Sequence, residues 1–545
     1  MKQQINADLH RFRKSTTQKN VIHKLLILSA LICVNPLLLF SCSAKPTDMR
    51  SLAPADSLVY LETNDLAAAL QPIIDSKPFN EVAKYKPDLS ALKGVQLAVA
   101  VTGFETSEEK VDDEQVIGRI EPHFVAIADT HAWNFQAVGF AETKLGSFVE
   151  KIYDQSPTLE KTDKHGGKYF TWTALDGRKS YALVIDSLIY FANDESSIEK
   201  CLAVRHNEVD SIIKTGKVPN ASQEILASGY VSTDGVAQIA NIVGLQFASE
   251  SSEDSEVQSA IAGIVPQLLR SSITEISWAS TKTEHGIEDK YSISMPSDIA
   301  DVFNKTMAPS ASVDDSIREA LPAELESVSV YKLKDPQIAL RSLMLTAAKR
   351  TDPLVGEIIG EYVKETFDTL GIHDPEIFLS SIGTVVATAR RHIDDEPIAI
   401  IAPLKDQKTT ESALSDKTRP LLEPVPNSRV RGWDEDGESM SVVFEKSRVL
   451  IGYESIVDLC GTAAVHKRPT VTPELFRQNG SSVATIGKES VASEIADLLS
   501  EKKSEGVIAV SLYFSETFFT SAGIERKTTS DFGLIGSIIA QLAQD

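Results

Sequence analysis

The feature that most constrains the fold is a similarity between the two halves of the 545-residue chain. Residues 180–201 align without gaps on residues 439–460, which places Cys201 opposite Cys460. Two further pairs of segments match in the same order, the openings at 52–56 and 321–324 and the Gly-Ile-Glu-x-Lys segments at 286–290 and 523–527. Because shared order is hard to obtain by chance, we predict two tandem copies of one domain, copy A over 50–312 and copy B over 316–545.

Each copy is expected to begin with a strand and a helix capped by Asp65 or Asp335, and to continue into a hairpin. The hairpins turn at Asp176-Gly177 and Asp436-Gly437, and strands joined by such turns are antiparallel. Strands are predicted at 58–62, 95–102, 124–129, 168–174, 180–185 and 188–192, and in copy B at 328–333, 384–389, 398–402, 441–444 and 448–452. Helices are predicted at 143–153, from Asp194 and at 454–464. This mixture predicts an α+β fold, with a mixed, largely antiparallel sheet and packed helices in each copy.

Three further segments are interpreted from their composition. Two acidic runs in copy A, 105–114 and 248–256, have no apolar periodicity and are predicted to be solvated loops. Residues 526–531 are predicted to be the N-cap region of the closing helix, with Ser530 as the cap.

The N-terminus has the order of an export signal. A basic segment ending at Lys24 precedes the apolar residues 25–40, and a small-residue site follows at Ser41-Cys42-Ser43-Ala44. Leu39-Phe40-Ser41-Cys42 resembles the lipobox of bacterial lipoproteins, in which the cysteine is acylated and becomes the mature N-terminus. The resemblance implies a signal peptide at 1–41, lipid on Cys42, a spacer at 42–49 and a membrane partner bound through acyl chains. Cleavage near Ser43 without a lipid is the alternative; an uncleaved anchor would need roughly 20 apolar residues.

The charge of the chain excludes one class of partner. Its net charge is −23, and residues 1–41 carry six basic and one acidic side chains, so the remainder carries −28. A body this acidic repels phosphate backbones, so a nucleic-acid partner is not expected.

Cys201 and Cys460 are the only cysteines after Cys42. They could form a disulfide in an exported protein, but matched positions in two copies should lie far apart, so both are expected to be buried small side chains. Ser197-x-x-Lys200 followed by Lys214-Thr215-Gly216 matches two motifs of penicillin-binding enzymes. The separation is too short for that fold, and we interpret the match as coincidence.

Two other groups of residues are candidate ligand sites. Residues 392–396 could supply oxygen ligands to calcium, although a charged turn is expected there anyway. Tyr169, Phe170, Trp172 and Trp433 could stack on a glycan, although strand aromatics more often face a core. No catalytic, cofactor or metal-binding residues are therefore predicted, and Cys42 is the one predicted site.

The opening at Leu52–Glu62, the Asp-Gly hairpin followed by Glu-Ser, and the duplication together resemble a family of exported bacterial proteins of unknown function with a duplicated α+β domain. The resemblance covers most of the mature chain and implies an envelope protein, without catalytic residues to transfer. By resemblance to the sorting signals of bacterial lipoproteins, Ser43 after the cysteine favours an outer membrane where the host has one. We therefore expect a non-enzymatic envelope lipoprotein with a binding or structural role, whose partner is an envelope protein or a glycan. The alternative is an envelope hydrolase with a site between the copies.

Overall fold

The structure is a computed structural model that describes residues 46–110, 116–153, 155–219, 224–251, 255–350, 353–391, 398–415, 430–435, 438–445, 447–461, 473–476, 479–499 and 508–543. These residues form an α+β fold in which helices pack on one extended antiparallel sheet. The predicted fold class is confirmed.

In the first half (46–312) the strands are β1 (Val59–Thr63), β2 (Gln96–Lys110), β3 (Val116–Asp129), β4 (Thr158–Lys164), β5 (Gly167–Thr173), β6 (Lys179–Ile185), β7 (Leu188–Ala192), β8 (Ile225–Val231), β9 (Glu275–Thr283) and β10 (Gly286–Ser294). The helices are α3 (Leu66–Asp75), α4 (Lys77–Val82), α5 (Asn134–Phe140), α6 (Gly146–Tyr153), α7 (Glu195–Arg205), α8 (Thr233–Ser251), α9 (Ser255–Ser272) and α10 (Ser297–Thr306).

In the second half (313–543) the strands are β11 (Ser327–Lys332), β12 (Val385–Arg390), β13 (Ala399–Pro403), β14 (Val430–Glu435), β15 (Glu438–Glu445), β16 (Arg448–Tyr453), β17 (Val483–Glu489), β18 (Ser511–Thr520) and β19 (Gly523–Ser530). The helices are α11 (Asp315–Glu319), α12 (Pro336–Arg350), α13 (Pro353–Thr369), α14 (Pro375–Ser381), α15 (Gln407–Ser412), α16 (Glu454–Gly461), α17 (Ala492–Leu499) and α18 (Gly533–Ala543).

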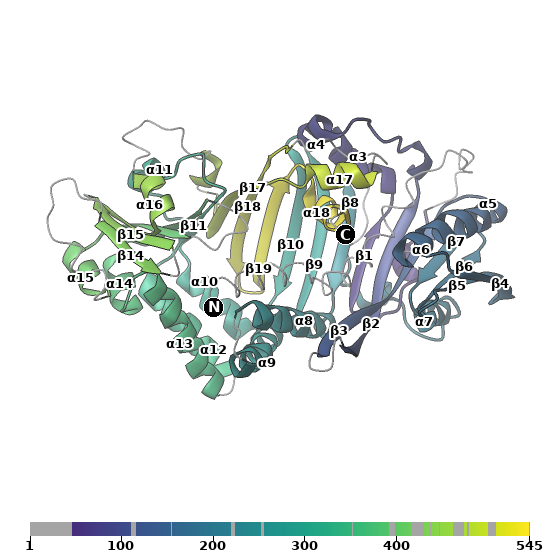
Figure 1. The fold of residues 1–545 in the computed structure, drawn as a ribbon, viewed down its shortest axis with the longest axis horizontal. Helices are drawn as coiled ribbons and strands as arrows, with labels where there is room; N and C mark the ends of the chain where they lie inside the picture. The colour runs from purple at the N-terminus through teal and green to yellow at the C-terminus, as the bar shows by residue number, and fades with distance from the viewer. Residues whose placement is uncertain are drawn as a thin grey trace.

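The strand pairings run outward in the same order from the middle of the sheet. Strands β10 and β19 pair with each other, and Figure 1 shows them side by side in the centre of the molecule. From β10 the pairing proceeds through β9, β8, β1, β2, β3, β7, β6, β5 and β4. From β19 it proceeds through β18, β17, β11, β12, β13, β16, β15 and β14. All these pairs are antiparallel.

The register corrects one detail of the sequence alignment. Tyr181 pairs with Ala192 in the first half, and Ser441 pairs with Gly452 in the second. These hairpins therefore correspond with a shift of 260 residues, whereas α7 and α16 start at Glu195 and Glu454, a shift of 259. The alignment needs a one-residue gap between strand and helix.

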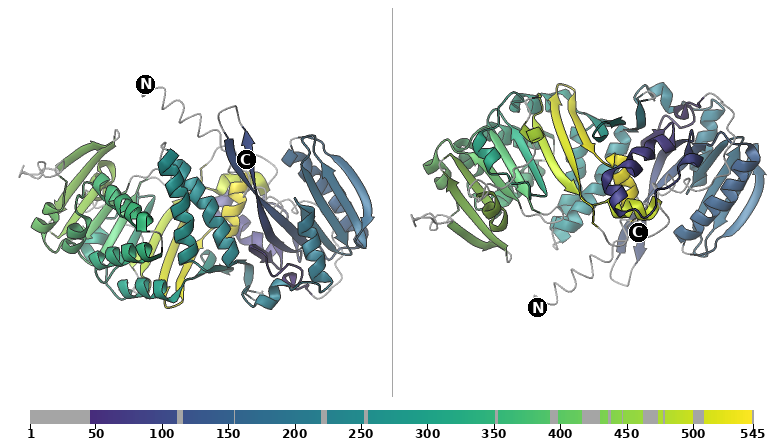
Figure 2. Two further views of the ribbon diagram at one scale, coloured as in Figure 1. Left: turned by 90° about the horizontal axis from the view of Figure 1, so that it is seen from below. Right: turned by 90° about the horizontal axis from the view of Figure 1, so that it is seen from above.

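The two halves share part of their hydrophobic core. One buried cluster joins side chains of α3, α4 and the first-half strands to Ile495 of α17, to Ile539 of α18 and to Phe532, which directly precedes α18. Full burial of a side chain such as Phe532 contributes about 2–3 kcal/mol. Helices α8, α9, α12 and α13 lie toward one end of the central strands, and α3, α4, α17 and α18 lie toward the other (Figure 1); Figure 2 shows the molecule from these two ends. The halves are thus packed together as well as paired through the sheet.

The two helix starts predicted at Asp65 and Asp335 are confirmed, because a capping hydrogen bond involves only residues close together in sequence. Asp65 accepts a hydrogen bond from the Ala68 amide at 3.0 Å, and Asp335 accepts one from the Ile338 amide at 3.1 Å. Each bond satisfies one of the amide groups that a first helical turn leaves without a partner.

The acidic runs are not loops in the residues that the structure describes, so that prediction was wrong. Residues 105–110 continue β2, whose pairing with β3 extends to Lys110 and Val116. Residues 248–251 end α8, and α9 begins at Ser255. Cross-strand and helical backbone bonding outweighs the charge of these segments, which composition alone cannot reveal.

The expected cap region before the closing helix is also different. Residues 526–530 belong to β19, and α18 begins only at Gly533. Ser530 nevertheless accepts a hydrogen bond from the Gly533 amide at 2.9 Å, as a capping side chain does.

Candidate functional site at the junction of the two halves

A pocket of about 380 Å³ lies at the junction of the two halves. It is built around the β10–β19 pair, where Ile287 pairs with Ser530 and Ser294 pairs with Gly523. Alternate residues of these strands point to one face, so β10 and β19 present side chains together beside α18. The pocket is lined by Asp289, Tyr291, Ile293, Glu489, Tyr513, Arg526, Thr528, Ser530, Gly533, Leu534 and Ser537.

Asp289 is the most constrained acidic side chain of this pocket. It is 1% exposed, and its Oδ1 accepts a hydrogen bond from the indole Nε1 of Trp278 at 2.8 Å. Its Oδ2 accepts one from the backbone amide of Leu534 at 2.7 Å, at the start of α18. Burial raises the pKa of Asp289, and these hydrogen bonds oppose the rise. The carboxyl group of one half therefore holds the first turn of a helix of the other.

Two more carboxyl groups have pKa values raised by burial. Glu489 ends β17, and its Oε1 accepts a hydrogen bond from the hydroxyl of Ser511 at 2.9 Å. Burial raises the pKa of Glu489, and the charges of Asp531 and Asp289 raise it further. The pKa of Asp531 is raised by burial. Acidic groups in this state bind protons more readily and can donate as well as accept hydrogen bonds.

Arg526 supplies the positive charge of the pocket. It lies opposite Tyr291 in the β10–β19 register, and its Nε donates to the hydroxyl of Ser515 at 2.7 Å. The residue is exposed, so its guanidinium group is accessible from solvent. Guanidinium groups pair with planar anions through two parallel hydrogen bonds.

Two tyrosines form the less polar walls. Burial raises the pKa values of both Tyr291 and Tyr513, so both phenols stay protonated at neutral pH. The ring of Tyr513 packs on Gly487, where a Cβ atom would come within 2.4 Å of the tyrosine Cζ. Gly487 is therefore required for the position of this ring.

The start of α18 fits closely against β10. Gly533 has a φ of +61°, a left-handed conformation that favours glycine. A Cβ at this position would lie 2.6 Å from Ile287 and 3.0 Å from the Asp289 carboxylate. The glycine thus allows the Leu534 amide to reach Asp289.

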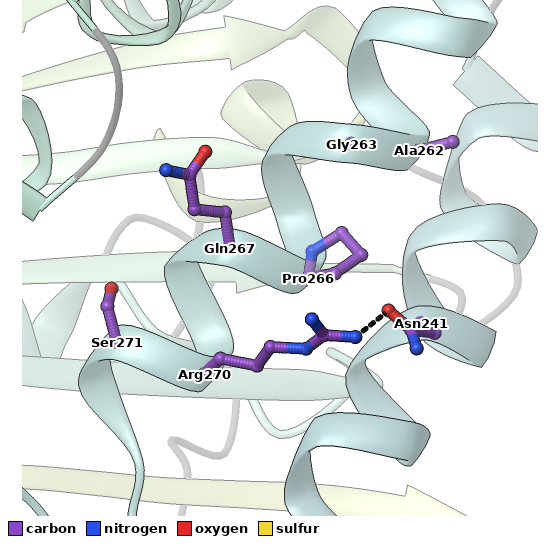
Figure 3. Close-up of a pocket in the computed structure, with 7 residues that line it drawn as sticks. All are labelled: Asn241, Ala262, Gly263, Pro266, Gln267, Arg270 and Ser271. Atoms are coloured by element: carbon purple, nitrogen blue, oxygen red, sulfur yellow. Dashed lines mark hydrogen bonds between the residues drawn. The ribbon is translucent and has the colours of Figure 1, made fainter.

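A second groove, of about 450 Å³, lies between α8 and α9. Figure 3 shows Arg270 reaching from α9 toward Asn241 on α8, to whose Oδ1 it donates a hydrogen bond. Arg270 Nε also donates to the carbonyl oxygen of Ala237 at 3.3 Å. Among the residues that the structure describes around this groove, Arg270 alone carries a charge, and its bonds to the neighbouring helix favour a structural role.

The predicted anchor residue, Cys42, lies outside the described residues. The two later cysteines, Cys201 and Cys460, are free thiols with 0% exposure, as expected of buried small side chains. Burial raises the pKa of each thiol to about 12.

The residues resembling penicillin-binding motifs do not form a comparable site. Ser197 is buried and shares a hydrogen bond of 2.7 Å with the hydroxyl of Thr102, and Lys200 Nζ donates to the Thr102 carbonyl oxygen at 2.9 Å. Residues 212–215 form a short 3-10 turn rather than a strand. Ser197 and Lys200 both bond to Thr102 of the underlying strand β2. These contacts agree with the interpretation that the motif match is a coincidence.

The remaining candidates divide between buried and undescribed residues. Tyr169, Phe170 and Trp172 are buried, and Phe170 stacks on Trp172 with a centroid separation of 5.7 Å. The side chain of Trp433, residues 392–396 and the turn at Asp436-Gly437 lie outside what the structure describes. Within the described part of the chain, no cluster of three or more potential metal ligands is present.

Sequence reasoning missed the junction pocket, although one signal pointed near it. Asp289 and Arg526 occupy the same variable position in the two matched Gly-Ile-Glu-x-Lys segments. The match indicates that the two segments are copies of one repeat. Their strand pairing, which brings these two residues to one pocket, cannot be read from local sequence.

No helix among the described residues combines the length and the apolar character needed to cross a bilayer.

Comparisons with known proteins add little. No family model and no curated protein matches the sequence. Two solved structures, crystal forms I and IV of TP0453, are similar to 47% and 45% of this chain and to 80% and 79% of theirs, at 10% identity. The TM-scores of 0.23 and 0.21 are too low to support a shared fold or function.

Proposed function

We propose that this protein is an envelope lipoprotein, acylated at Cys42, whose body binds a ligand in the junction pocket rather than catalysing a reaction. The basic segment, the apolar residues 25–40 and the lipobox-like Leu39–Cys42 support the anchor. Acyl chains would hold the mature chain to a membrane without a spanning helix. Ser43 favours the outer membrane in a host that has one.

The observation that carries the binding role is the composition of the junction pocket. Asp289 and Tyr291 come from the first half, and Glu489, Tyr513 and Arg526 come from the second. Ligand sites occur preferentially between packed units and combine apolar walls with a few polar groups. Here both halves must be in place before the polar groups meet.

The groups lining the pocket favour a small saccharide with one carboxylate. Arg526 can pair with a carboxylate, while Glu489 and the hydroxyls of Thr528, Ser530 and Ser537 can exchange hydrogen bonds with sugar hydroxyls. The rings of Tyr291 and Tyr513 offer surfaces against which a sugar ring can pack. The volume of about 380 Å³ fits a ligand of one or two sugar rings.

A matched pair of ligands tests this proposal. N-acetylmuramic acid differs from N-acetylglucosamine by a lactyl carboxylate, and calorimetry on the full-length protein in detergent can compare the two. We expect the acid to bind at least tenfold more tightly, and Arg526→Ala to abolish that difference. Arg178→Ala, which removes a charge from the turn before β6, away from the central strands β10 and β19 (Figure 1), is the control and should leave binding unchanged. Equal affinity of the wild type for both sugars would contradict the proposal.

An envelope hydrolase remains the second candidate, because the pocket holds two carboxyl groups with raised pKa values. Both oxygens of Asp289 accept hydrogen bonds from fixed donors, which leaves Glu489 as the acidic group more able to exchange protons. Because only one of the two carboxyl groups can readily exchange protons, the pocket favours ligand binding over hydrolysis. Turnover of a labelled saccharide that is lost in Glu489→Gln would support the hydrolase instead.

We also propose that the two halves arose by duplication of one domain. The matching order of strand pairs supports this origin, and so does the pairing of Lys290 with Lys527, the last residues of the two matched segments. An approximate two-fold axis through that pair would relate the halves. Superposition of 50–312 on 316–543 in an experimental structure is the test.

A further inference from the structure

The chain is fixed to the body only five residues after Cys42. Thr47 donates its backbone amide to Gln96 Oε1 at 2.8 Å and its hydroxyl to Asp129 Oδ2 at 2.6 Å, and its carbonyl oxygen accepts from Gln96 Nε2 at 2.7 Å. Gln96 and Asp129 are 1% and 3% exposed, and Met49 is buried. We call Thr47, Gln96 and Asp129, which meet where β2 starts and β3 ends, the clamp.

The short tether limits how far the clamp can lie from a membrane. Five residues of extended chain span at most about 17 Å. A lipid on Cys42 would therefore keep the surface around the clamp close to the headgroups, whereas remote parts of the body would face away.

Two large aromatic side chains are exposed beside the clamp. Trp133 is 59% exposed and Phe135 is 72% exposed, and they follow Asp129 by four and six residues. The intervening chain is held in place, because the His131 amide donates to Asp129 Oδ1 at 3.1 Å and the Thr130 amide donates to the Ser187 carbonyl oxygen at 3.1 Å. Both aromatics thus lie on an ordered surface next to the tether.

We propose that this surface docks on the membrane, with Trp133 and Phe135 inserted at the boundary between headgroups and acyl chains. Tryptophan is enriched at that boundary because its ring is apolar while its N–H can bond to headgroups. The inference rests on the proposed acylation of Cys42. It adds an orientation, in which the clamp faces the membrane and the body extends from it.

The charge of the body favours apolar contact over electrostatic attraction. The chain after residue 41 carries a net charge of −28, which anionic headgroups would repel. Docking through two aromatic rings avoids this penalty on a zwitterionic surface, so phosphatidylethanolamine with phosphatidylcholine is the surface that fits.

Leu175 provides a matched control. It is 89% exposed in the turn before β6, whereas the turn at residues 186–187, next to the clamp, follows the other end of that strand. A seven-residue strand separates the two turns by about 20 Å.

Fluorescence quenching in vesicles tests the proposal. Full-length lipoprotein is reconstituted into vesicles of phosphatidylethanolamine and a phosphatidylcholine brominated near its headgroup. Trp133 is one of four tryptophans, so we expect Trp133→Phe to remove about a quarter of the wild-type emission and most of its lipid-dependent quenching. Phe135→Ala should reduce the quenching at least twofold, and Leu175→Ala should leave it unchanged.

A parallel measurement separates the two proposals. Metabolic labelling with a clickable fatty acid reports acylation, and Cys42→Ala should abolish the label. If the protein is labelled but wild type and Trp133→Phe show the same lipid-dependent quenching, docking is wrong and the anchor stands. If the protein carries no label, the proposed anchor is wrong and docking falls with it.

Discussion

The carboxylate of Asp289 accepts a hydrogen bond at 2.7 Å from the backbone amide of Leu534, a residue 245 positions later in the chain. The bond joins β10 of the first half to the first turn of α18 in the second. The same carboxylate accepts a hydrogen bond from the indole Nε1 of Trp278 at 2.8 Å, so one buried group connects both halves at the wall of the junction pocket.

Replacement of Asp289 should destabilise the whole protein. Asp289→Ala leaves two donors without partners in a buried site, and we expect a loss of about 2–4 kcal/mol in the free energy of unfolding. Asp289→Asn, whose amide has only one acceptor oxygen, should cost about 1–2 kcal/mol. Urea unfolding measures both, with the exposed Asp163→Asn as control. A loss in Asp289→Ala no larger than in the control would show that the contact contributes nothing.

Glu489 should make stability depend on pH. Its pKa is raised above the usual 4.5, so the folded state keeps the proton to higher pH than the unfolded chain does. Its contribution to stability is complete below about pH 4.5 and is lost as the pH rises through the raised pKa. The Tm of Glu489→Gln minus that of the wild type should therefore increase from pH 4.5 to pH 7. Glu160→Gln, an exposed strand position, should show no such trend, and a flat difference for Glu489→Gln would refute the prediction.

Much of the local structure could be predicted from sequence, whereas the junction could not. The strand at Leu188–Ala192 agrees with the prediction to the residue, and α7 and α16 begin at Glu195 and Glu454, within one residue of their predicted starts. These features depend on neighbouring residues. The β10–β19 pairing joins residues more than 220 positions apart, and no local pattern specifies it. The extension of β2 through an acidic run likewise depends on a partner strand. Asp289 and Glu489 look like ordinary strand carboxylates until the packing is known.

Gly487 should control the shape of the pocket. A methyl group there would overlap the ring of Tyr513, so Gly487→Ala must displace the tyrosine. We expect a loss of about 1–3 kcal/mol in stability and weaker binding of N-acetylmuramic acid. Gly139→Ala, at a helical position with open space around its Cβ, should change neither property. Unchanged binding in Gly487→Ala would place the ligand elsewhere.

The thiols of Cys201 and Cys460 should be unreactive in the native state. Both are fully buried, and burial raises the pKa of each to about 12, so almost no thiolate forms at pH 8. Ellman's reagent should titrate no thiol in the folded acylated protein and two after addition of urea. Rapid reaction of either cysteine before unfolding would contradict their placement.

The membrane anchor and the docked orientation both depend on the lipid at Cys42, and the intact mass of the protein extracted from its native membrane tests that lipid most directly. We predict a mature chain that begins at Cys42 and carries the added mass of its acyl groups. An unmodified chain that begins at any other residue would contradict the anchor and the membrane-docked orientation together.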